Sequence, residues 1–147
     1  MIDKVEIKHS PKKKSTNIRK LVEEKLINRV KDKVHTNIKL DHNLIPNLFF
    51  SYDMDCIGKN GVLVGAKSVD FTSTKNTLDN TISHYSNLIA LLSINLNKDI
   101  VKNKFFLIAE EPNNLESPEY VLWDTIQTNP LFKVIHPEQS ELVAENI

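Results

Sequence analysis

The sequence has a single cysteine, Cys56, and no apolar run that approaches the length needed to cross a bilayer. One cysteine excludes an internal disulfide framework and the cysteine-rich zinc modules, so a reducing, cytoplasmic location is expected. The first residues, from Met1 onward, lack the charged-then-apolar pattern of a secretory signal. No histidine pair has metal-ligand spacing and no serine lies in a nucleophile-elbow context, so neither kind of catalytic site is expected.

Net charge is absent as well, because 19 basic residues balance 19 acidic residues. The protein is therefore not a polycation as a whole, although its positive charge is concentrated in the first quarter of the chain. This concentration is suited to steering a nucleic acid toward the N-terminal helix, and the alternative is a set of solvated helix faces. The residues chosen as nucleic-acid contacts are Lys12, Lys13, Lys14 and Arg19.

A length of 147 residues fits one domain with a real core, and 40% hydrophobic residues is ordinary for a globular protein. No repeat, low-complexity tract or long linker divides the chain. We therefore expect a basic N-terminal arm over residues 1–14, an α/β domain over residues 15–136 and a polar C-terminal tail over residues 137–147.

The first half of the chain predicts a helix followed by a hairpin. Apolar residues recur at helical spacing over residues 15–34, behind a serine or threonine that can cap the helix. Residues 48–57 and 62–71 have strand character, and the Gly-Lys-Asn-Gly segment at 58–61 between them is a strong hairpin signal.

The second half predicts alternating helices and strands, and its expected elements are a long helix over 78–96, a buried strand over 104–109, a helix over 118–127 and a strand over 131–135. Strands joined by a tight turn must be antiparallel, whereas a helical crossover allows the next strand to be parallel. The fold class expected is thus α/β, a single-domain mixed β-sheet flanked by helices on both faces.

The hairpin carries the residues of greatest chemical interest, with Asp53 and Asp55 on its first strand and Lys67 on its second. In these residues and in element order, the chain resembles the PD-(D/E)xK nuclease superfamily, the restriction-endonuclease-like fold, over roughly residues 15–110. The resemblance implies a helix-strand-strand-helix-strand core in which Asp55 binds a metal ion. Residues 65–67, Gly-Ala-Lys, stand where the family has its acid-x-lysine triplet.

Family chemistry of this kind uses Mg²⁺ (or Mn²⁺) held by carboxylates, with a lysine that stabilises the developing charge. The resemblance implies Asp55 and Lys67 as catalytic residues, and Asp55, Asp53 and Glu23 as metal ligands. Gly65 replaces the second acid and supplies neither charge nor ligand. Two functions stay open on this basis: a Mg²⁺-dependent DNA endonuclease, or a catalytically inactive binding or inhibitory module that contacts nucleic acid or a protein partner.

Other expectations concern assembly. A nuclease core of this size usually dimerises or joins a larger assembly to grip a duplex, so a homodimer or a subunit role is expected, with DNA as the nucleic acid. A third possibility, from another class of protein, is an accessory or structural subunit whose resemblance to nucleases is accidental.

The register of the hairpin decides whether the acids and the lysine meet. Strand alternation places Gly65 and Lys67 on one face, and it places Asp53 and Asp55 together on one face of the other strand. A two-residue turn would set Asp55 opposite Ala66, whereas a three-residue loop with a glycine bulge would set Asp55 opposite Gly65. The second register is preferred because it assembles the site.

Two further acids, Glu23 and Asp79, are candidates for the site, and Glu110 and Glu111 form a separate and weaker constellation. Glu23 is preferred from the first helix because it lies at the shoulder of the apolar stripe. Asp79 reaches the site only if the long helix begins nearby. Glu110 and Glu111 follow the buried strand and are placed to line a crevice at the end of the sheet, although such a pair more often marks where a strand leaves the core.

Overall fold

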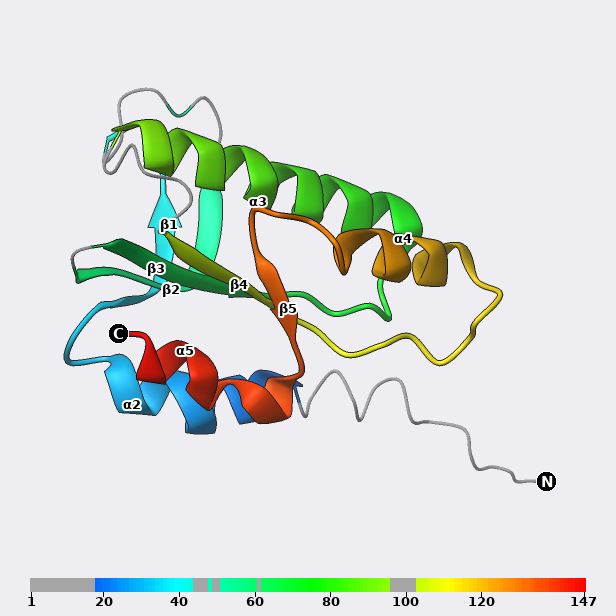
Figure 1. Ribbon diagram of the computed structural model, residues 1–147, viewed down its shortest axis with the longest axis horizontal. Helices are drawn as coiled ribbons and strands as arrows, with labels where there is room; N and C mark the ends of the chain where they lie inside the picture. The colour runs from blue at the N-terminus through cyan, green and yellow to red at the C-terminus, as the bar shows by residue number, and fades with distance from the viewer. Residues whose placement is uncertain (1–17, 44–47, 49–50, 61, 96–102) are drawn as a thin grey trace.

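The computed structural model describes residues 18–43, 48, 51–60, 62–95 and 103–147. In these ranges the chain forms a five-stranded sheet with a helical layer on each face (Figure 1). The strands are β1 (His35–Leu40), β2 (Tyr52–Asn60), β3 (Val62–Ser68), β4 (Lys104–Ile108) and β5 (Lys133–Ile135). The expected basic arm, residues 1–14 with Lys12, Lys13 and Lys14, lies outside the described residues.

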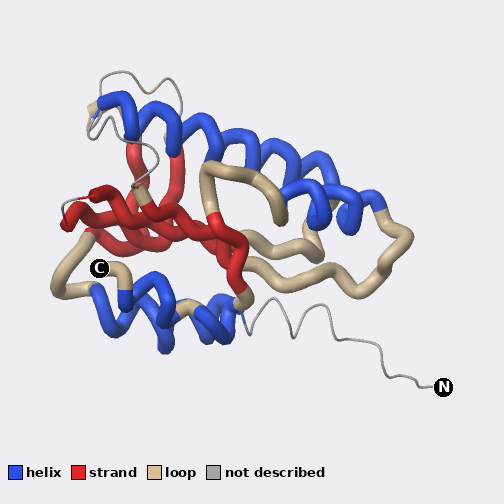
Figure 2. Tube along the Cα trace, in the orientation of Figure 1, coloured by secondary structure: helices blue, strands red, loops and turns tan. Residues whose placement is uncertain are grey.

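The helices divide between the two faces of the sheet (Figure 2). One layer consists of α3 (Lys75–Asn95) and α4 (Pro118–Ile126), and the other of η2 (Glu23–Ile27), α2 (Asn28–Val30), η3 (Pro137–Gln139) and α5 (Glu141–Glu145). Chain segments from the two ends of the sequence therefore lie side by side below the sheet, where Lys25 pairs with Glu141 at 3.6 Å.

The sheet is mixed, as the sequence predicts, and its strands follow one another in the order β1-β2-β3-β4-β5. β2 is antiparallel to both β1 and β3, while β3, β4 and β5 run parallel. The parallel pairs are joined through α3 and α4, which both cover the same face of the sheet. The expected antiparallel hairpin and the helical crossover to a parallel strand are confirmed.

Two apolar cores result, one on each face of the sheet. The α3-side core contains residues of α3, α4 and the upper face of the sheet, among them Met54, Ile57, Leu63, Tyr85, Leu88, Phe105 and Leu107. The α5-side core contains residues of the first helix, α5 and the lower face, among them Val22, Leu26, Val30, Cys56, Val64, Ala66, Phe106 and Val143. Cys56 is buried in this core, and burial raises the pKa of its thiol to about 12.

The first helix is shorter than the sequence suggests. Its described part runs from Ile18 to Val30 and includes a π-helical turn, η2. The residues that follow form β1, an edge strand that the sequence analysis missed. The helical stripe ends because Val34 is already half-buried beside the sheet, and Ile38 and Leu40 then alternate onto the α3-side core in the manner of a strand.

The remaining elements lie close to their expected positions. β4 and α4 are confirmed, and Ser117 caps α4 by accepting a hydrogen bond from the Tyr120 amide at 3.2 Å. β3 ends at Ser68 rather than at residue 71, because the Asp70 carboxylate accepts hydrogen bonds from Thr72 and forms a turn. No helix in the described ranges has both the length and the apolar character that crossing a membrane requires.

The C-terminal segment, expected as a polar tail over residues 137–147, packs against the rest of the protein. It forms η3 and α5, and Ser140 and Val143 are fully buried. The Ser140 hydroxyl donates a hydrogen bond of 2.7 Å to the carbonyl of Pro137, so its burial leaves the hydroxyl satisfied. This segment completes the α5-side core.

Candidate functional site

The observed register of the hairpin differs from both registers that the sequence suggested. Cys56 pairs with Ala66 and Ile57 pairs with Gly65, so Asp55 is opposite neither Gly65 nor Ala66. The expectation of a three-residue loop is wrong because the ladder continues closer to the turn than expected, up to the pair of Asn60 with residue 62.

Asp53 lies between Tyr52 and Met54, which both pack in the α3-side core, so regular alternation turns its side chain to the opposite face of β2. Met54 packs in the α3-side core, whereas Cys56, two residues later, packs in the α5-side core. Residues two apart in a regular strand share a face, so the alternation of β2 is interrupted at Asp55. Asn37, the β1 residue between the pairs that Met54 and Cys56 form, has a φ of 48°, which marks an irregularity at the same level of the neighbouring strand.

Asp55 faces the first helix and lines a hollow of about 120 Å³, which we call the Asp55 hollow. Its lining residues are Arg19, Val22, Glu23, Ile27, Asn37 and Asp55. The structure thus brings Glu23, the acid preferred from the first helix, to Asp55. Arg19, expected as a nucleic-acid contact, lies in the same hollow.

The Asp55 carboxylate is held in place by the strand beside it. Its Oδ2 accepts a hydrogen bond of 2.6 Å from the amide of Ser68. Burial raises the pKa of Asp55, and this effect outweighs the hydrogen bonds from Ser68 and the positive charges of Lys67 and Arg19, which lower it. Because β3 already engages one carboxylate oxygen, Asp55 has a structural role whatever else it binds.

Lys67 opens on the opposite face of the sheet, toward α3. It lines a second hollow of about 160 Å³, the Lys67 hollow, together with Ser51, Tyr52, Asp53, Thr81, His84, Tyr85 and Leu88. The Lys67 amine donates a hydrogen bond of 2.9 Å to the backbone carbonyl of Asp53. The expected site is therefore divided: Glu23 accompanies Asp55 below the sheet, whereas Lys67 opens above it.

Asp79 lines neither hollow. Its carboxylate lies 3.3 Å from the Lys75 amine, one turn earlier on α3. This exposed ion pair gives the Asp79 carboxylate a local structural role on the helix surface.

Gly65, the position of the missing acid, lies in the α3-side core. A Cβ atom added to Gly65 would be 2.9 Å from Cε of Met54 and 3.0 Å from Cε1 of Phe105. A carboxylate at this position would be surrounded by apolar atoms, where a charge is very costly. The apolar surroundings explain physically why a metal-binding acid does not fit here.

The donor set for a metal ion is correspondingly small. Among the described residues, no group of three or more histidine, cysteine, aspartate or glutamate side chains is placed to hold a metal ion. Two acids, Glu23 and Asp55, and Asn37 line the Asp55 hollow, and one acid, Asp53, lines the Lys67 hollow. Of the three carboxylates that the resemblance implied for Mg²⁺ or Mn²⁺, the structure brings two, those of Glu23 and Asp55, to one hollow.

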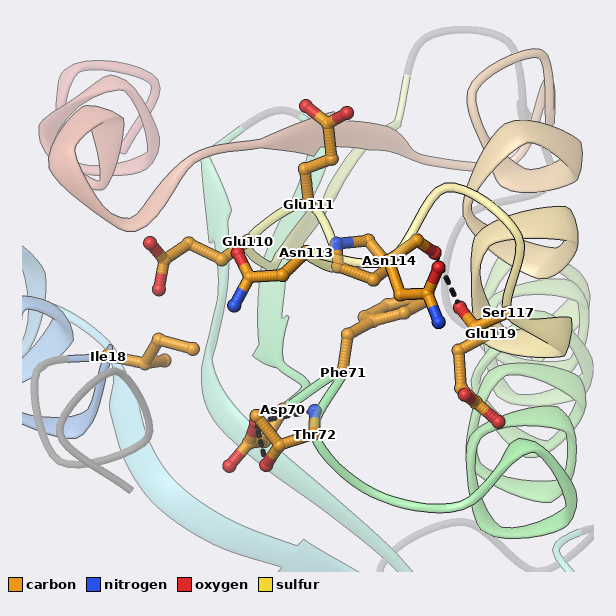
Figure 3. Close-up of a pocket in the computed structure, with 11 residues that line it drawn as sticks. Ile18, Asp70, Phe71, Thr72, Glu110, Glu111, Asn113, Asn114, Ser117 and Glu119 are labelled. Carbon is orange, nitrogen blue, oxygen red and sulfur yellow. Dashed lines mark hydrogen bonds between the residues drawn. The ribbon is translucent and has the colours of Figure 1, made fainter. Parts of the chain in front are cut away.

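A third hollow, the sheet-end crevice, lies where β3 and β4 leave the sheet (Figure 3). It has a volume of about 290 Å³, and four acids contribute to its lining: Asp70, Glu110, Glu111 and Glu119. Glu110 and Glu111 line this crevice, which is the first of the two alternatives that the sequence left open. Figure 3 shows the three glutamates pointing in different directions rather than toward one centre.

The acids of the crevice also have local partners. Glu111 accepts a hydrogen bond from the hydroxyl of Tyr120, which raises the pKa of that phenol to about 12. Glu110 lies 3.5 Å from the imidazole of His136. Because these side chains hold loops and helix ends in place, the crevice is explained by local structure.

Three polar or aromatic residues of the two hollows that flank the hairpin were not expected there from the sequence: Asn37, Tyr52 and Thr81. Thr81 and His84 are three residues apart on a helix, a spacing that places their side chains next to each other. That spacing was visible in the sequence, but nothing in it placed this face of α3 over Lys67. The sequence does not place Asn37 near Asp55, because it does not predict the strand β1 on which Asn37 lies.

No family model, no curated protein and no solved structure matches this chain. Any function therefore has to be argued from the geometry and chemistry of these hollows and of the surrounding surface.

Proposed function

We propose that this chain is a PD-(D/E)xK-like protein that binds nucleic acid and does not cleave it. One observation carries the proposal: Asp55 and Lys67, which a nuclease of this kind needs at one phosphate, open on opposite faces of the sheet. Gly65, the third position of the site, is enclosed by Met54 and Phe105.

The topology supports the relation to this fold. A helix precedes the antiparallel pair β2–β3, α3 follows, and β4 is then added parallel to β3; this is the element order on which the resemblance rests, with β1 added between the helix and β2. Asp55 lies on the first strand of the pair, Lys67 on the second, and Glu23 on the helix. Apart from β1, the element order agrees with the resemblance, while Asp55 and Lys67 lie on opposite sides of the sheet.

The surface of the first helix supports nucleic acid as the partner. Residues 18–33 contain six basic side chains against three acidic ones. Lys25 is the basic residue of this segment that pairs with Glu141, and the exposed basic residues are Arg19, Lys20, Arg29, Lys31 and Lys33. A row of exposed cations on one layer is the electrostatic footprint expected for contact with a phosphate backbone.

A Mg²⁺-dependent endonuclease is the second candidate, favoured by the presence of Glu23 and Asp55 in one hollow. Mg²⁺ is often held by one or two carboxylates together with phosphates of the substrate. This candidate differs from the first in requiring metal-dependent cleavage that depends on Asp55.

Binding and cleavage are tested together on the full chain. A fluorescein-labelled DNA duplex, a DNA single strand and an RNA single strand are titrated with protein, and each is then incubated with Mg²⁺ or Mn²⁺ and resolved on a gel. We expect binding without cleavage. The association constant should fall as salt is raised, by nearly one power of the salt concentration for each phosphate contact. The double variant Arg29→Gln/Lys31→Gln should bind more weakly, whereas Lys133→Gln, an exposed lysine on β5, should bind as the wild type does.

Two results would contradict the proposal. Absence of binding to all three probes at low salt would remove nucleic acid as the partner. Cleavage that requires metal and is lost in Asp55→Asn would establish the second candidate instead.

A further inference from the structure

The Lys67 hollow combines a cationic amine with several hydrogen-bonding side chains on the α3 side of the sheet. Lys67 comes from β3, Ser51 and Tyr52 from the start of β2, and Thr81 and His84 from α3. Three segments that are distant in the sequence thus converge on one small polar space, and its composition differs from the apolar core beneath it.

The Lys67 amine is only partly satisfied. It donates to the carbonyl oxygen of Asp53, a neutral acceptor. No ion pair in the described part of the chain includes Lys67. An ammonium group has three donors, so at least two remain for another acceptor. The half-buried amine is therefore suited to an anion that enters the hollow.

The neighbouring side chains add donors around the same space. Thr81 contributes a hydroxyl, and His84 carries an N–H group in either protonation state. Tyr52 packs edge-on against the His84 ring, with ring centroids 5.9 Å apart, and so restricts the orientation of the imidazole. The Tyr85 hydroxyl is already used, since it donates to the carbonyl of Phe106 at 2.7 Å.

We propose that the Lys67 hollow binds a phosphate group, with Lys67 as the cation and Thr81 and His84 as flanking donors. A volume of about 160 Å³ is below the ~300–1,000 Å³ typical of sites that enclose a drug-sized ligand, so the hollow suits a phosphate group rather than a whole nucleotide. Lysine is an established binder of phosphate as a point charge.

Asp53 is the one acidic residue among those that line the same hollow. Its side chain is exposed, and its negative charge weakens the attraction that Lys67 exerts on a phosphate. The site is therefore expected to be weak in the wild type. Asp53→Asn should strengthen phosphate binding, which is a change that a purely structural role of Lys67 would not produce.

The phosphate could come from either of two sources. Only one of these sources makes the hollow part of the proposed function. If the phosphate belongs to a nucleic-acid backbone, the hollow is part of the proposed binding function and rests on it. If it belongs to a free nucleotide or to inorganic phosphate, the hollow is a separate ligand site.

The test is a titration of the ¹⁵N-labelled full chain with sodium phosphate at constant ionic strength, followed by NMR. We expect saturable amide shifts centred on Asp53, Lys67, Thr81 and His84. Lys67→Met should weaken binding at least about tenfold, the scale expected for one charge-assisted hydrogen bond, and Lys67→Arg should retain part of it. Asp53→Asn should tighten binding, and the control Lys133→Met should leave it unchanged.

Adenosine 5′-monophosphate and a labelled oligonucleotide distinguish the sources. If Lys67→Met weakens binding of the oligonucleotide, the phosphate belongs to a nucleic-acid backbone. If the nucleotide shifts the amide signals of the hollow while Lys67→Met leaves oligonucleotide binding unchanged, the hollow binds a free ligand. If inorganic phosphate binds but no oligonucleotide does, the phosphate site stands and the proposed function falls. If oligonucleotides bind while phosphate and nucleotide leave the hollow unshifted and Lys67→Met has no effect, the phosphate site is overturned and the proposed function stands.

Loss of the fold in Lys67→Met is monitored by thermal denaturation of each variant. If Lys67→Met unfolds, phosphate binding is measured on His84→Gln instead, since the exposed His84 side chain is not part of either core. The amide shifts of the wild type test the proposal without any variant. Shifts scattered over exposed lysines, rather than centred on the Lys67 hollow, would overturn the proposed phosphate site.

Discussion

The Asp55 carboxylate accepts a 2.6 Å hydrogen bond from the Ser68 amide, yet it is removed from much of the solvent. Its pKa lies above the ordinary value of 3.8, chiefly through burial. The folded state therefore binds this proton more readily than the unfolded chain does. Stability contributed by the neutral carboxyl group is fully present at low pH and is lost as the pH rises from the unfolded pKa through the folded one.

The raised pKa of Asp55 predicts how the stability of Asp55→Asn, relative to the wild type, depends on pH. The variant keeps an acceptor oxygen for Ser68 and removes the buried charge, so it should be more stable than the wild type at neutral pH. The advantage should shrink as the pH falls toward the unfolded pKa. Urea denaturation of both proteins at several values from about pH 3.5 to about pH 7 measures the difference. An advantage for the wild type that grows with pH would mean that Arg19 and Lys67 dominate instead.

Gly65 allows a second test at the scale of one residue. Gly65→Ala introduces a Cβ that is tightly enclosed by Met54 and Phe105, and we expect a loss of about 1–3 kcal/mol in the free energy of unfolding. Gly65→Asp adds a charge to the same apolar space and should cost clearly more than the alanine variant, without creating metal binding. A Gly65→Asp protein as stable as Gly65→Ala, or stabilised by Mg²⁺, would show that this position opens to a site.

At the scale of elements, the long helix, the buried strand β4 and the capped helix α4 could be predicted from the sequence. Each is determined by local signals: the helical stripe beneath α3, the apolar run of β4, and the Ser-Pro pair that begins α4. β1 could not be predicted, because four of its six residues are polar or charged (a histidine, a threonine, an asparagine and a lysine). It forms a strand only by pairing with β2.

The same distinction applies to the candidate site. That Asp55, Lys67 and Glu23 lie near the hairpin could be inferred from sequence, but the side of the sheet on which each opens could not. The face depends on the interruption in β2 near Asp55, and this interruption is set by packing on both faces rather than by local propensity. A one-residue change in alternation was enough to divide the expected site.

The cap of α4 provides a prediction for an element. Ser117 accepts from the Tyr120 amide and donates to the carbonyl of Asn114 at 2.8 Å. Ser117→Ala should cost ~1 kcal/mol in stability, whereas Ser117→Asp, which keeps a capping oxygen, should lie close to the wild type. Urea denaturation compares the three proteins, and equal losses in both variants would show that the hydroxyl donor, not the cap, is what matters.

At the scale of the whole molecule, the sheet separates two different surfaces. The Asp55 hollow opens below the sheet beside the basic first helix, and the Lys67 hollow opens above it beside α3. A sheet that kept a working nuclease site would present the acids and the lysine to one phosphate. Here the division leaves a basic helix surface on one side and a polar hollow with a lysine on the other, which is the basis for proposing binding without cleavage.

The most direct test of this account is thermal denaturation in EDTA, Mg²⁺ and Mn²⁺, performed on the wild type, on Asp55→Asn and on the control Glu110→Gln. A metal ion present at 100 times its Kd stabilises by ≈ 2.7 kcal/mol, which corresponds to a rise in Tm of roughly 5–10 °C for a protein of this size. We predict no metal-dependent rise in any of the three proteins. A rise in the wild type and in Glu110→Gln that Asp55→Asn abolishes would contradict the account and establish a metal site at Asp55.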